Sequence, residues 1–531
     1  MKNNILRWRN KMSGKCRKIM YALVVTVFAA FLWMICCEND RKVSDKAIGE
    51  TTVQSMRSGE KTVSLEQSDI PKIEIEDLTD AFTVILQYAP KDMLAGCTVD
   101  ESFLMWFYAQ YGRDAVIHIA FDVLDGGNDP DVWYEETGNS IHVLWLLYCR
   151  DSGFGQHELE NVYWMQTAAA SEMVFGFAGD INFAENWYTT EYMKEQPDGL
   201  WDCFSEDLLA QMQGVDVMIM NNEFTYVNKK GATSVYGKAY TFRADPQKAE
   251  LLEIFGTDTV TLANNHVYDY GKRGLLSTLD ALDQEGIPYS GAGRNLKDAS
   301  KIIYYVMNGR KVAFVSATQI ERSKQYTKAA TETEPGVLKA LHPEKFLKIV
   351  EEAAQNSDYV IAEVHWGTEG MLYPDQSQRH LAEQIAQAGA DVIIGGHPHR
   401  LQGAAFVGDV PIAYSLGNFW FSTGTLYTTL SKVTITEDGT VKLSFVPCIQ
   451  QNLTTRILTE PEERSDFYEY LASISADIGI DVDGVVYHKS ADDYPAEEIL
   501  YDSDTSRTDI IGIADNEGDA IDIVGNLKED R

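Results

Sequence analysis

The chain has 531 residues, enough for two or three domains, and its 80 Asp and Glu against 45 Lys and Arg give a formal net charge of −35. Because so acidic a protein repels polyanions, we expect no nucleic-acid partner and no attraction to an anionic membrane face. The seven cysteines show no C-x-x-C and no zinc-type spacing, which argues against a disulfide framework and a cysteine-based metal site. One pairing stays open, between Cys97 and Cys149, if their helices meet outside the cell.

The N-terminus has the pattern of a membrane anchor. Residues 1–19 carry seven Lys and Arg, and the 18 residues 20–37 that follow have no charge. This predicts a cytoplasmic basic segment and a single-pass transmembrane helix, with the body of the protein extracellular. Two alternatives stay open. One is a cleaved signal peptide, although no small-x-small site follows, and the other is a lipid-modified Cys36 or Cys37, although large residues precede them.

The next two segments differ in character. Residues 38–70 are polar and poor in large apolar side chains, which predicts a flexible stalk. Residues 71–165 are predicted to form a helical accessory region whose aromatic residues belong to its core. The string T-V-D-E at 98–101 resembles a capping box. Helical apolar spacing is found at 81–88, 102–111 and 141–148.

From residue 173 short apolar strands alternate with amphipathic helices, which favours an α/β fold. Strands are expected at 173–178, 215–220, 259–262, 312–316, 359–364, 392–394 and 412–415, and helices at 246–254, 273–285, 343–354 and 378–388. A helical extension is expected over 461–491. The acidic segment 492–531, poor in aromatic residues, is predicted to be disordered.

Five of these strands end in polar residues that could bind metal. Ligands of open α/β sheets bind at the carboxyl ends of strands, and mixed oxygen and imidazole donors suit zinc, manganese or iron. A single histidine at a strand end is usually a core residue, but five polar strand ends favour one shared site. Its members are Asp180, Glu223, Asn265, His365, His397 and His399.

The segment 260–271, V-T-L-A-N-N-H-V-Y-D-Y-G, carries the most concentrated signal. Asn265 could ligate a metal through its amide oxygen, and His266 could donate a proton or contact an anion. Asp269 could orient the imidazole of His266, as carboxylates commonly do. The alternative is a polar turn that caps the next helix.

Eight strings in this region resemble the poly-γ-glutamate capsule-biosynthesis family (CapA family), which is similar to the calcineurin-like metallophosphoesterases. They are G-D-I, N-x-E, F-R-A-x-P, L-A-N-N-H-x-x-D-Y-G, G-A-G-R-N-L, H-W-G-T-E, G-x-H-P-H-x-x-Q and Y-S-L-G-N-F. The resemblance covers about residues 173–425. It implies a metallophosphoesterase-like domain over 170–460, a sandwich of two β-sheets flanked by helices.

The resemblance also implies a role for each site residue, around two divalent metal ions (Mn, Zn or Fe). Asp180 and His399 would hold the first metal, Asn265, His365 and His397 the second, and Glu223 would bridge them. Asn182 stands where the wider superfamily has a histidine, a departure that weakens the first metal's ligand set. His266 and Asp269 would be catalytic. Arg243, Asn418 and Glu369 would face the substrate.

Three functions remain as hypotheses. The first is a membrane-anchored hydrolase or transferase that acts on a phosphoester or a γ-glutamyl polymer, since two cations can polarise a phosphoryl oxygen and an imidazolium can protonate a leaving group. The second is a non-catalytic accessory that binds or exports an anionic capsule polymer beside capsule synthase subunits. The third is an adhesion or sensor module that works through the helical region.

Overall fold

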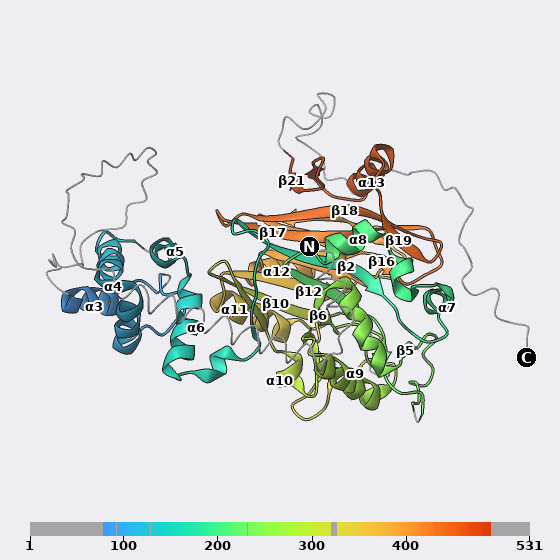
Figure 1. Cartoon of the computed structure of the whole chain (residues 1–531), viewed down its shortest axis with the longest axis horizontal. Helices are drawn as coiled ribbons and strands as arrows, with labels where there is room; N and C mark the ends of the chain where they lie inside the picture. The colour runs from blue at the N-terminus through green and yellow to red at the C-terminus, as the bar shows by residue number, and fades with distance from the viewer. Residues whose placement is uncertain (1–77, 92, 128, 231, 320–325, 490–531) are drawn as a thin grey trace, which may run out of the picture. The chain divides into compact units, whose positions relative to one another are not determined.

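The computed structural model describes residues 78–489 except 92, 128, 231 and 320–325 (Figure 1). The basic segment 1–19, the anchor 20–37, the stalk 38–70 and the tail 492–531 lie outside the described residues. No helix in the described part of the chain is long and apolar enough to cross a membrane. The anchor, the extracellular location and the domain boundaries therefore stay predictions.

The helical region has its own apolar core. Phe107 and Trp133 are fully buried there, as expected for core aromatics, and Trp106 and Trp145 pack partly buried against them, whereas Tyr108 is exposed. Its helices are α3 (Leu78–Tyr88), α4 (Glu101–Leu124), α5 (Asp131–Thr137), α6 (Ile141–Ser152) and the 3₁₀ helix η1 (Gln156–Leu159).

Two details of this region differ from the expectations. The capping residue of α4 is Asp100, whose side chain accepts a hydrogen bond from the Phe103 N–H at 2.9 Å, so the capping box expected from Thr98 is wrong. The helix begins one residue after Asp100, which leaves Thr98 too far upstream to reach its first turn. Cys97 and Cys149 are both free cysteines, so the pairing left open between them is not formed.

The first large sheet has the strand order β19-β18-β17-β2-β3-β6-β7, with β16 beside β2. The strands β2, β3, β6 and β7 run parallel, whereas β17, β18 and β19 form an antiparallel half. The bounds are β2 (Glu172–Ile181), β3 (Val217–Asn222), β6 (Thr257–Thr261), β7 (Tyr289–Ser290), β16 (Asn418–Trp420), β17 (Leu426–Thr436), β18 (Val441–Gln451) and β19 (Thr454–Ile457).

The second large sheet has the order β1-β9-β10-β12-β13-β15-β14, in which β10, β12, β13 and β15 are parallel. Its strands are β1 (Val162–Trp164), β9 (Ile303–Met307), β10 (Arg310–Thr318), β12 (Tyr359–His365), β13 (Val392–Gly396), β14 (Leu401–Val407) and β15 (Val410–Leu416). Three short pairs complete the strands: β4 (Thr225–Tyr226) with β5 (Arg243–Ala244), β8 (Ala292–Gly293) with β11 (Gly336–Val337), and β20 (Ile478–Ile480) with β21 (Val486–His488).

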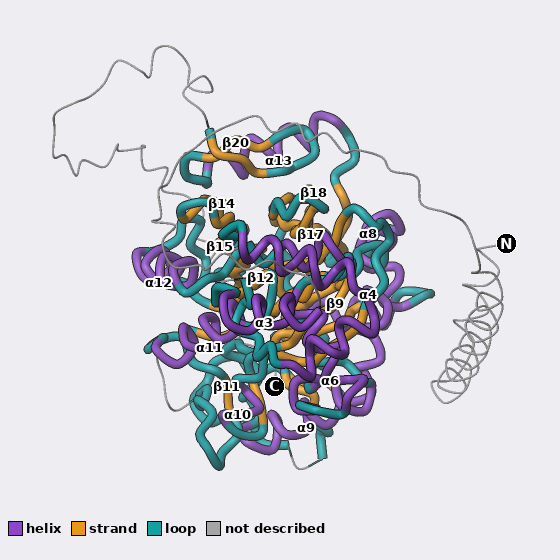
Figure 2. Tube along the Cα trace, turned by 90° about the vertical axis from the view of Figure 1, so that its left-hand side faces the viewer, coloured by secondary structure: helices purple, strands orange, loops and turns teal. Residues whose placement is uncertain are grey.

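The two sheets pack face to face through alternate side chains, because successive residues of a strand point to opposite faces. Phe175, Phe177 and Ile219 of the first sheet share one core with Phe314 and Ile361 of the second. The outer faces are covered by helices (Figures 1 and 2). Those on the first sheet include α8 (Glu206–Met212), η3 (Pro246–Phe255) and α9 (Gly271–Glu285), and those on the second are α11 (Glu344–Gln355) and α12 (Gln376–Gln387).

This arrangement confirms the expected α/β fold with two sheets flanked by helices. All seven strands expected from the sequence are present. The helix expected at 246–254 is a 3₁₀ helix, η3, which begins at Pro246 behind the capping residue Asp245. The remaining helices are α7 (Tyr188–Glu195), η2 (Gly199–Cys203), α10 (Leu296–Ala299) and α13 (Pro461–Ser473), and α13 lies beside β18 and β14.

Four aspartates form the same kind of hydrogen bond where the parallel strands begin. Each accepts the N–H of the neighbouring strand at 2.6–2.8 Å: Asp216 from Val174, Asp258 from Met218, Asp358 from Lys311 and Asp391 from Val360. Backbone N–H groups buried at a sheet edge need such a partner. The aspartates therefore supply the amino-terminal edge of both sheets with acceptors.

The buried aspartates at the strand starts should make the free energy of unfolding depend on pH. Burial raises the pKa of Asp391 from its ordinary 3.8 to about 6. Between these values the folded protein binds the proton more tightly than the unfolded chain. The contribution to the free energy of unfolding is therefore fully present below the ordinary pKa and is lost as the pH rises through about 6. Asp391→Asn keeps an acceptor but cannot ionise. We expect its unfolding free energy, measured by denaturant titration, to fall less with rising pH than that of the wild type.

The matched control is Asp409→Asn, which changes an exposed carboxylate on the turn between β14 and β15. This variant should keep the wild-type slope. An Asp391→Asn slope equal to that of the wild type would contradict the role assigned to the buried carboxylate.

Candidate metal centre

The predicted site residues come from the carboxyl ends of strands in both sheets. Asp180 lies near the end of β2, Glu223 directly follows β3, and His365 is the last residue of β12. Asn265 lies four residues after β6, and His397 directly follows β13, with His399 two residues further. Because these strands run parallel within each sheet and the sheets pack face to face, their ends meet at one edge.

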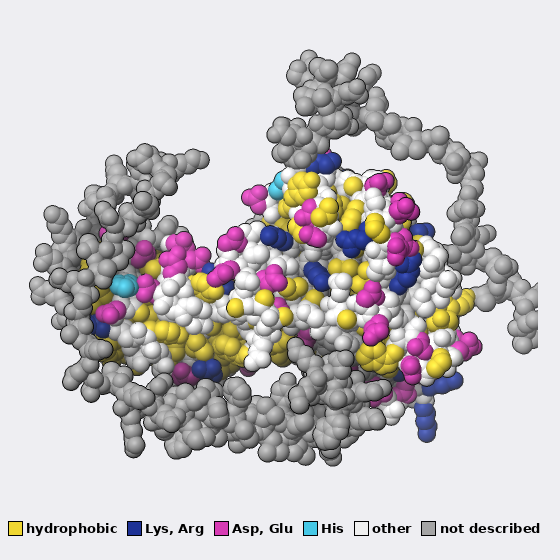
Figure 3. Space-filling view, turned by 45° about the horizontal axis from the view of Figure 1, so that its top comes forward, with side chains coloured by type: hydrophobic (Ala, Val, Ile, Leu, Met, Phe, Trp, Pro, Cys, Tyr) yellow, Lys and Arg dark blue, Asp and Glu magenta, His cyan; other side chains and the backbone are white. Residues whose placement is uncertain are grey.

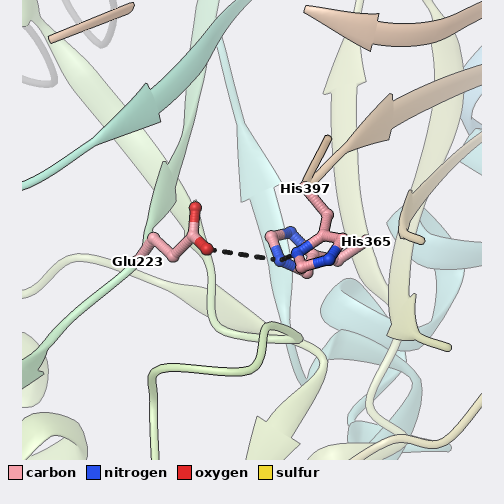
Figure 4. A group of neighbouring side chains, drawn as sticks. All are labelled: Glu223, His365 and His397. Carbon is pink, nitrogen blue, oxygen red and sulfur yellow. Dashed lines mark hydrogen bonds and ion pairs between the residues drawn. The ribbon is translucent and has the colours of Figure 1, made fainter. Parts of the chain in front are cut away.

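Glu223 faces His365 and His397 of the second sheet (Figure 4). Its side chain is fully buried, and its Oε1 is 3.5 Å from His365 Nε2 and 3.8 Å from His399 Nε2. Among the described residues no group forms a hydrogen bond with this oxygen. A buried carboxylate oxygen faced by two ring nitrogens at more than hydrogen-bond distance has the surroundings of a ligand around a cation.

Two groups of ligand atoms share Glu223. One is Asp180, Glu223 and His399, and the other is Glu223, His365 and His397, and within each group the ligand atoms lie within 4.8 Å of one another. Asn265 adds its amide oxygen to the second group, 2.8 Å from His365 Nε2. The donors are carboxylate, amide and imidazole, a set that is consistent with divalent metal ions such as zinc, manganese or iron.

The backbone around the ligands is held in unusual conformations. His397 and His399 have φ angles of 98° and 58°, a region that residues other than glycine seldom adopt and that is often found at functional sites. Gly179 lets β2 approach the next segment closely, since a Cβ there would lie 2.1 Å from the Gly417 carbonyl oxygen. The Asp180 N–H donates to that same oxygen at 2.9 Å, which fixes the position of the Asp180 side chain.

Burial and neighbouring charges shift the pKa values of the ligands. Burial, together with the charge of Asp180, holds the pKa of Glu223 well above its usual range. Burial lowers the pKa of His365 to about 3, so its imidazole is neutral and free to ligate at neutral pH. Burial opposes ionisation of Asp180 and His399 as well, but their hydrogen bond and mutual attraction outweigh it, which lowers the pKa of Asp180 and raises that of His399.

Beside the ligands, His266 and Asp269 form a buried pair. His266 Nδ1 lies 2.7 Å from Asp269 Oδ2, and the Phe242 N–H donates to the same carboxylate oxygen at 2.6 Å. The alternative of a turn that caps the next helix does not hold, because Tyr270 precedes α9 and no side chain caps it. The turn is built by Asn264, whose Oδ1 accepts the N–H groups of His266 and Val267.

Lys238 completes this pair and was missed by the sequence analysis. Its Nζ contacts Asp269 Oδ1, lies 2.6 Å from the Asn265 carbonyl oxygen, and is 3.2 Å from His266 Nδ1. It lies in a long irregular segment between β4 and β5, where no periodic pattern marks a functional residue. Asn221 was missed too. Its amide donates to Asp180 Oδ1 at 2.7 Å and to Glu223 Oε2 at 3.4 Å, so it ties the two carboxylates together.

The remaining predicted residues lie in different surroundings. Asn418 Oδ1 is 2.9 Å from His399 Nδ1, so it orients that ligand. The Arg243 guanidinium is buried, pairs with Glu185, and donates to the Val227 carbonyl oxygen, so it is occupied within the protein. Asn182 uses its Oδ1 to accept the Ala184 N–H at 2.8 Å. Glu369 is exposed and lies beside His397 and His399.

The part of the chain that carries the site is similar to known proteins. Residues 174–423 match the model of a family described as "Bacterial capsule synthesis protein PGA_cap". A 223-residue stretch is 34% identical to "Capsule biosynthesis protein CapA" of Bacillus anthracis, and covers 41% of this chain and 53% of that protein. A 214-residue stretch is 34% identical to "PGA biosynthesis protein CapA" of Bacillus subtilis, and covers 40% of this chain and 55% of that protein.

A more distant relative carries a different description. Over 188 residues the chain is 27% identical to "Probable polyglutamine synthesis accessory protein Rv0574c" of Mycobacterium tuberculosis, which covers 34% of this chain and 50% of that protein. The chain thus spans about half the length of the curated relatives that it matches.

The geometry predicts different effects for two histidines. His266→Ala should lower turnover by ~10²–10⁴-fold and leave the metal content unchanged, because His266 contacts Asp269 and Lys238 rather than the ligand group. His397→Ala should lower both, because His397 belongs to the ligand group. Elemental analysis of the two purified variants, together with their turnover, checks this. Equal loss of metal from both would show that His266 is a ligand.

Proposed function

Because residues 174–423 match the model of the bacterial capsule synthesis protein family PGA_cap, we propose that the protein acts in the biosynthesis of a capsule polymer such as poly-γ-glutamate. Its catalytic part would be a metal-dependent hydrolase or transferase with a metallophosphoesterase-like site. The observation that carries this proposal is the buried Glu223 carboxylate, which faces His365 and His399 without a hydrogen bond at its Oε1.

Divalent ions held by the two ligand groups would supply Lewis acidity toward the reacting carbonyl or phosphoryl oxygen. The protein's own contribution is to place a proton. Since His266 Nδ1 is 2.7 Å from a carboxylate oxygen of Asp269, this nitrogen carries a hydrogen and donates it to Asp269. In the neutral imidazole, which burial favours by lowering the pKa of His266, the other ring nitrogen, Nε2, carries no hydrogen. It would therefore take a proton from the attacking nucleophile and then give that proton to the leaving group. Lys238 and the Phe242 N–H hold the Asp269 carboxylate in place.

The chain would bind an anionic polymer mainly through metal ions. Arg243, the arginine predicted to face the substrate, is occupied by Glu185. The net charge of −35 repels polyglutamate over longer distances. On the face shown in Figure 3, Asp and Glu side chains are spread over the surface among Lys and Arg. Cations at the centre would therefore have to offset this repulsion at the point where the polymer binds.

A second candidate function is a non-catalytic accessory role, in which the metal centre binds the polymer or stabilises the fold. The occupied Arg243 favours it, and so does the accessory description of the mycobacterial relative. In both functions we propose that the predicted helix at 20–37 anchors the protein in the cell membrane, with its body outside and capsule synthase subunits as partners.

The test uses the full chain loaded with Mn²⁺, Zn²⁺ or Fe²⁺ and offered a phosphodiester and a γ-glutamyl oligomer. We expect one substrate class to be cleaved and Asp180→Asn to abolish cleavage, because Asp180 is a buried member of the first ligand group. Polymer production by cells that carry each variant is measured in parallel. Normal production with Asp180→Asn, without cleavage by the wild type, would favour the accessory function.

A further inference from the structure

The first ligand group is short of donors. Asp180, Glu223 and His399 offer three protein ligands, whereas zinc ordinarily takes four, and manganese or iron up to six. Asn182 was the fourth expected ligand. Its Oδ1 instead accepts the Ala184 N–H, and its Nδ2 is a buried donor with no hydrogen-bond partner among the described residues. The amide is therefore turned toward its own loop.

Glu369 lies beside two histidines of the centre. A carboxylate oxygen of Glu369, a ring nitrogen of His397 and a ring nitrogen of His399 all lie within 4.8 Å of one another. His399 is also a member of the first ligand group and His397 of the second, so Glu369 shares one neighbour with each group, and the first is the one that lacks donors. Glu369 is exposed, whereas the other two carboxylates, Asp180 and Glu223, are at most 1% exposed.

The loop that carries Glu369 is fastened to the segment that carries the two histidines. The Gly370 N–H donates to the Pro398 carbonyl oxygen at 2.8 Å. The Gln402 amide donates to the carbonyl oxygens of Met371 and Tyr373 at 3.1 and 3.2 Å. Gln402 is fully buried and accepts in turn from the equally buried Gln378 at 2.9 Å. A buried amide pair that fixes an exposed loop is a positioning device rather than a chance contact.

The carboxylate of Glu369 has two histidines, His397 and His399, as its neighbours. Among the described residues no Lys or Arg pairs with its carboxylate and no N–H group donates to it. A further carboxylate beside His397 and His399 adds negative charge next to the two ligand groups, which favours a cation there.

We propose that Glu369 is a metal ligand, which binds from the solvent side the cation held by Asp180, Glu223 and His399. This inference rests on the proposed metal-dependent function. It gives the H-W-G-T-E string at 365–369 two roles at one centre, because His365 is its first residue and Glu369 its last.

Metal binding to the full chain, stripped with a chelator, provides the test. Mn²⁺ is titrated and followed by calorimetry, and the bound metal is counted by elemental analysis. We expect two Mn²⁺ per wild-type chain. With Glu369→Gln one Mn²⁺ should bind as in the wild type and the other roughly 10–100-fold more weakly, since loss even of a residue that only supports a ligand has an effect of that size.

The matched control is Glu351→Gln, which removes an exposed carboxylate from α11, outside the centre. It should bind both ions as the wild type does. Glu369→Asp, which retains the charge on a shorter side chain, should bind the weakened ion more tightly than Glu369→Gln.

The outcomes separate the two proposals. If Glu369→Gln binds two ions with wild-type affinity, Glu369 is not a ligand, and the metal-dependent function stands. If the wild type binds no Mn²⁺, Zn²⁺ or Fe²⁺, the proposed function fails, and the ligand role fails with it. If Glu351→Gln weakens binding as much as Glu369→Gln does, the effect is general electrostatics and the inference is overturned.

Discussion

The buried carboxylate of Glu223 sets the requirement that the rest of the centre meets. Removing an ionised carboxylate from water is unfavourable by several kcal/mol unless opposite charge and hydrogen bonds compensate. Its Oε2 receives one long hydrogen bond from Asn221, and its Oε1 faces ring nitrogens of His365 and His399 without a hydrogen bond among the described residues. Compensation must come from a bound cation or from protonation of the carboxylate. In either case the stability of the fold depends on what the site holds.

The groups that surround the Glu223 carboxylate come from both sheets. Glu223 and Asp180 come from the first sheet, and His365 and His397 come from the second. The apolar layer between the sheets, which includes Phe177 and Phe314, fixes the distance between the two sets of strand ends. Close packing of such interiors allows little adjustment. The ligand geometry is therefore set by the packing of side chains at some distance from any polar atom of the centre.

The sequence predicted the site residues that directly follow a strand with a clear apolar pattern. Runs such as 359–364 and 392–394 marked strands, and the polar residues that followed them were brought together at one edge. It was uninformative where position depends on irregular backbone. Nothing in the pattern placed Lys238 against Asp269, and nothing paired Arg243 with Glu185, because both contacts join segments that only the tertiary fold brings together. The left-handed conformations of His397 and His399 were likewise invisible, since neither residue is glycine.

The aspartates at the start of the strands have a meaning beyond stability. Asp358 and Asp391 directly precede β12 and β13, which end in His365 and lead into His397. Such a strand carries an aspartate where it enters the sheet and a ligand where it leaves. Apolar alternation alone is the same in both directions, so it cannot tell one edge of a parallel sheet from the other. In this chain the direction of each such strand can be told from the sequence, because an aspartate marks its start and a ligand marks its end.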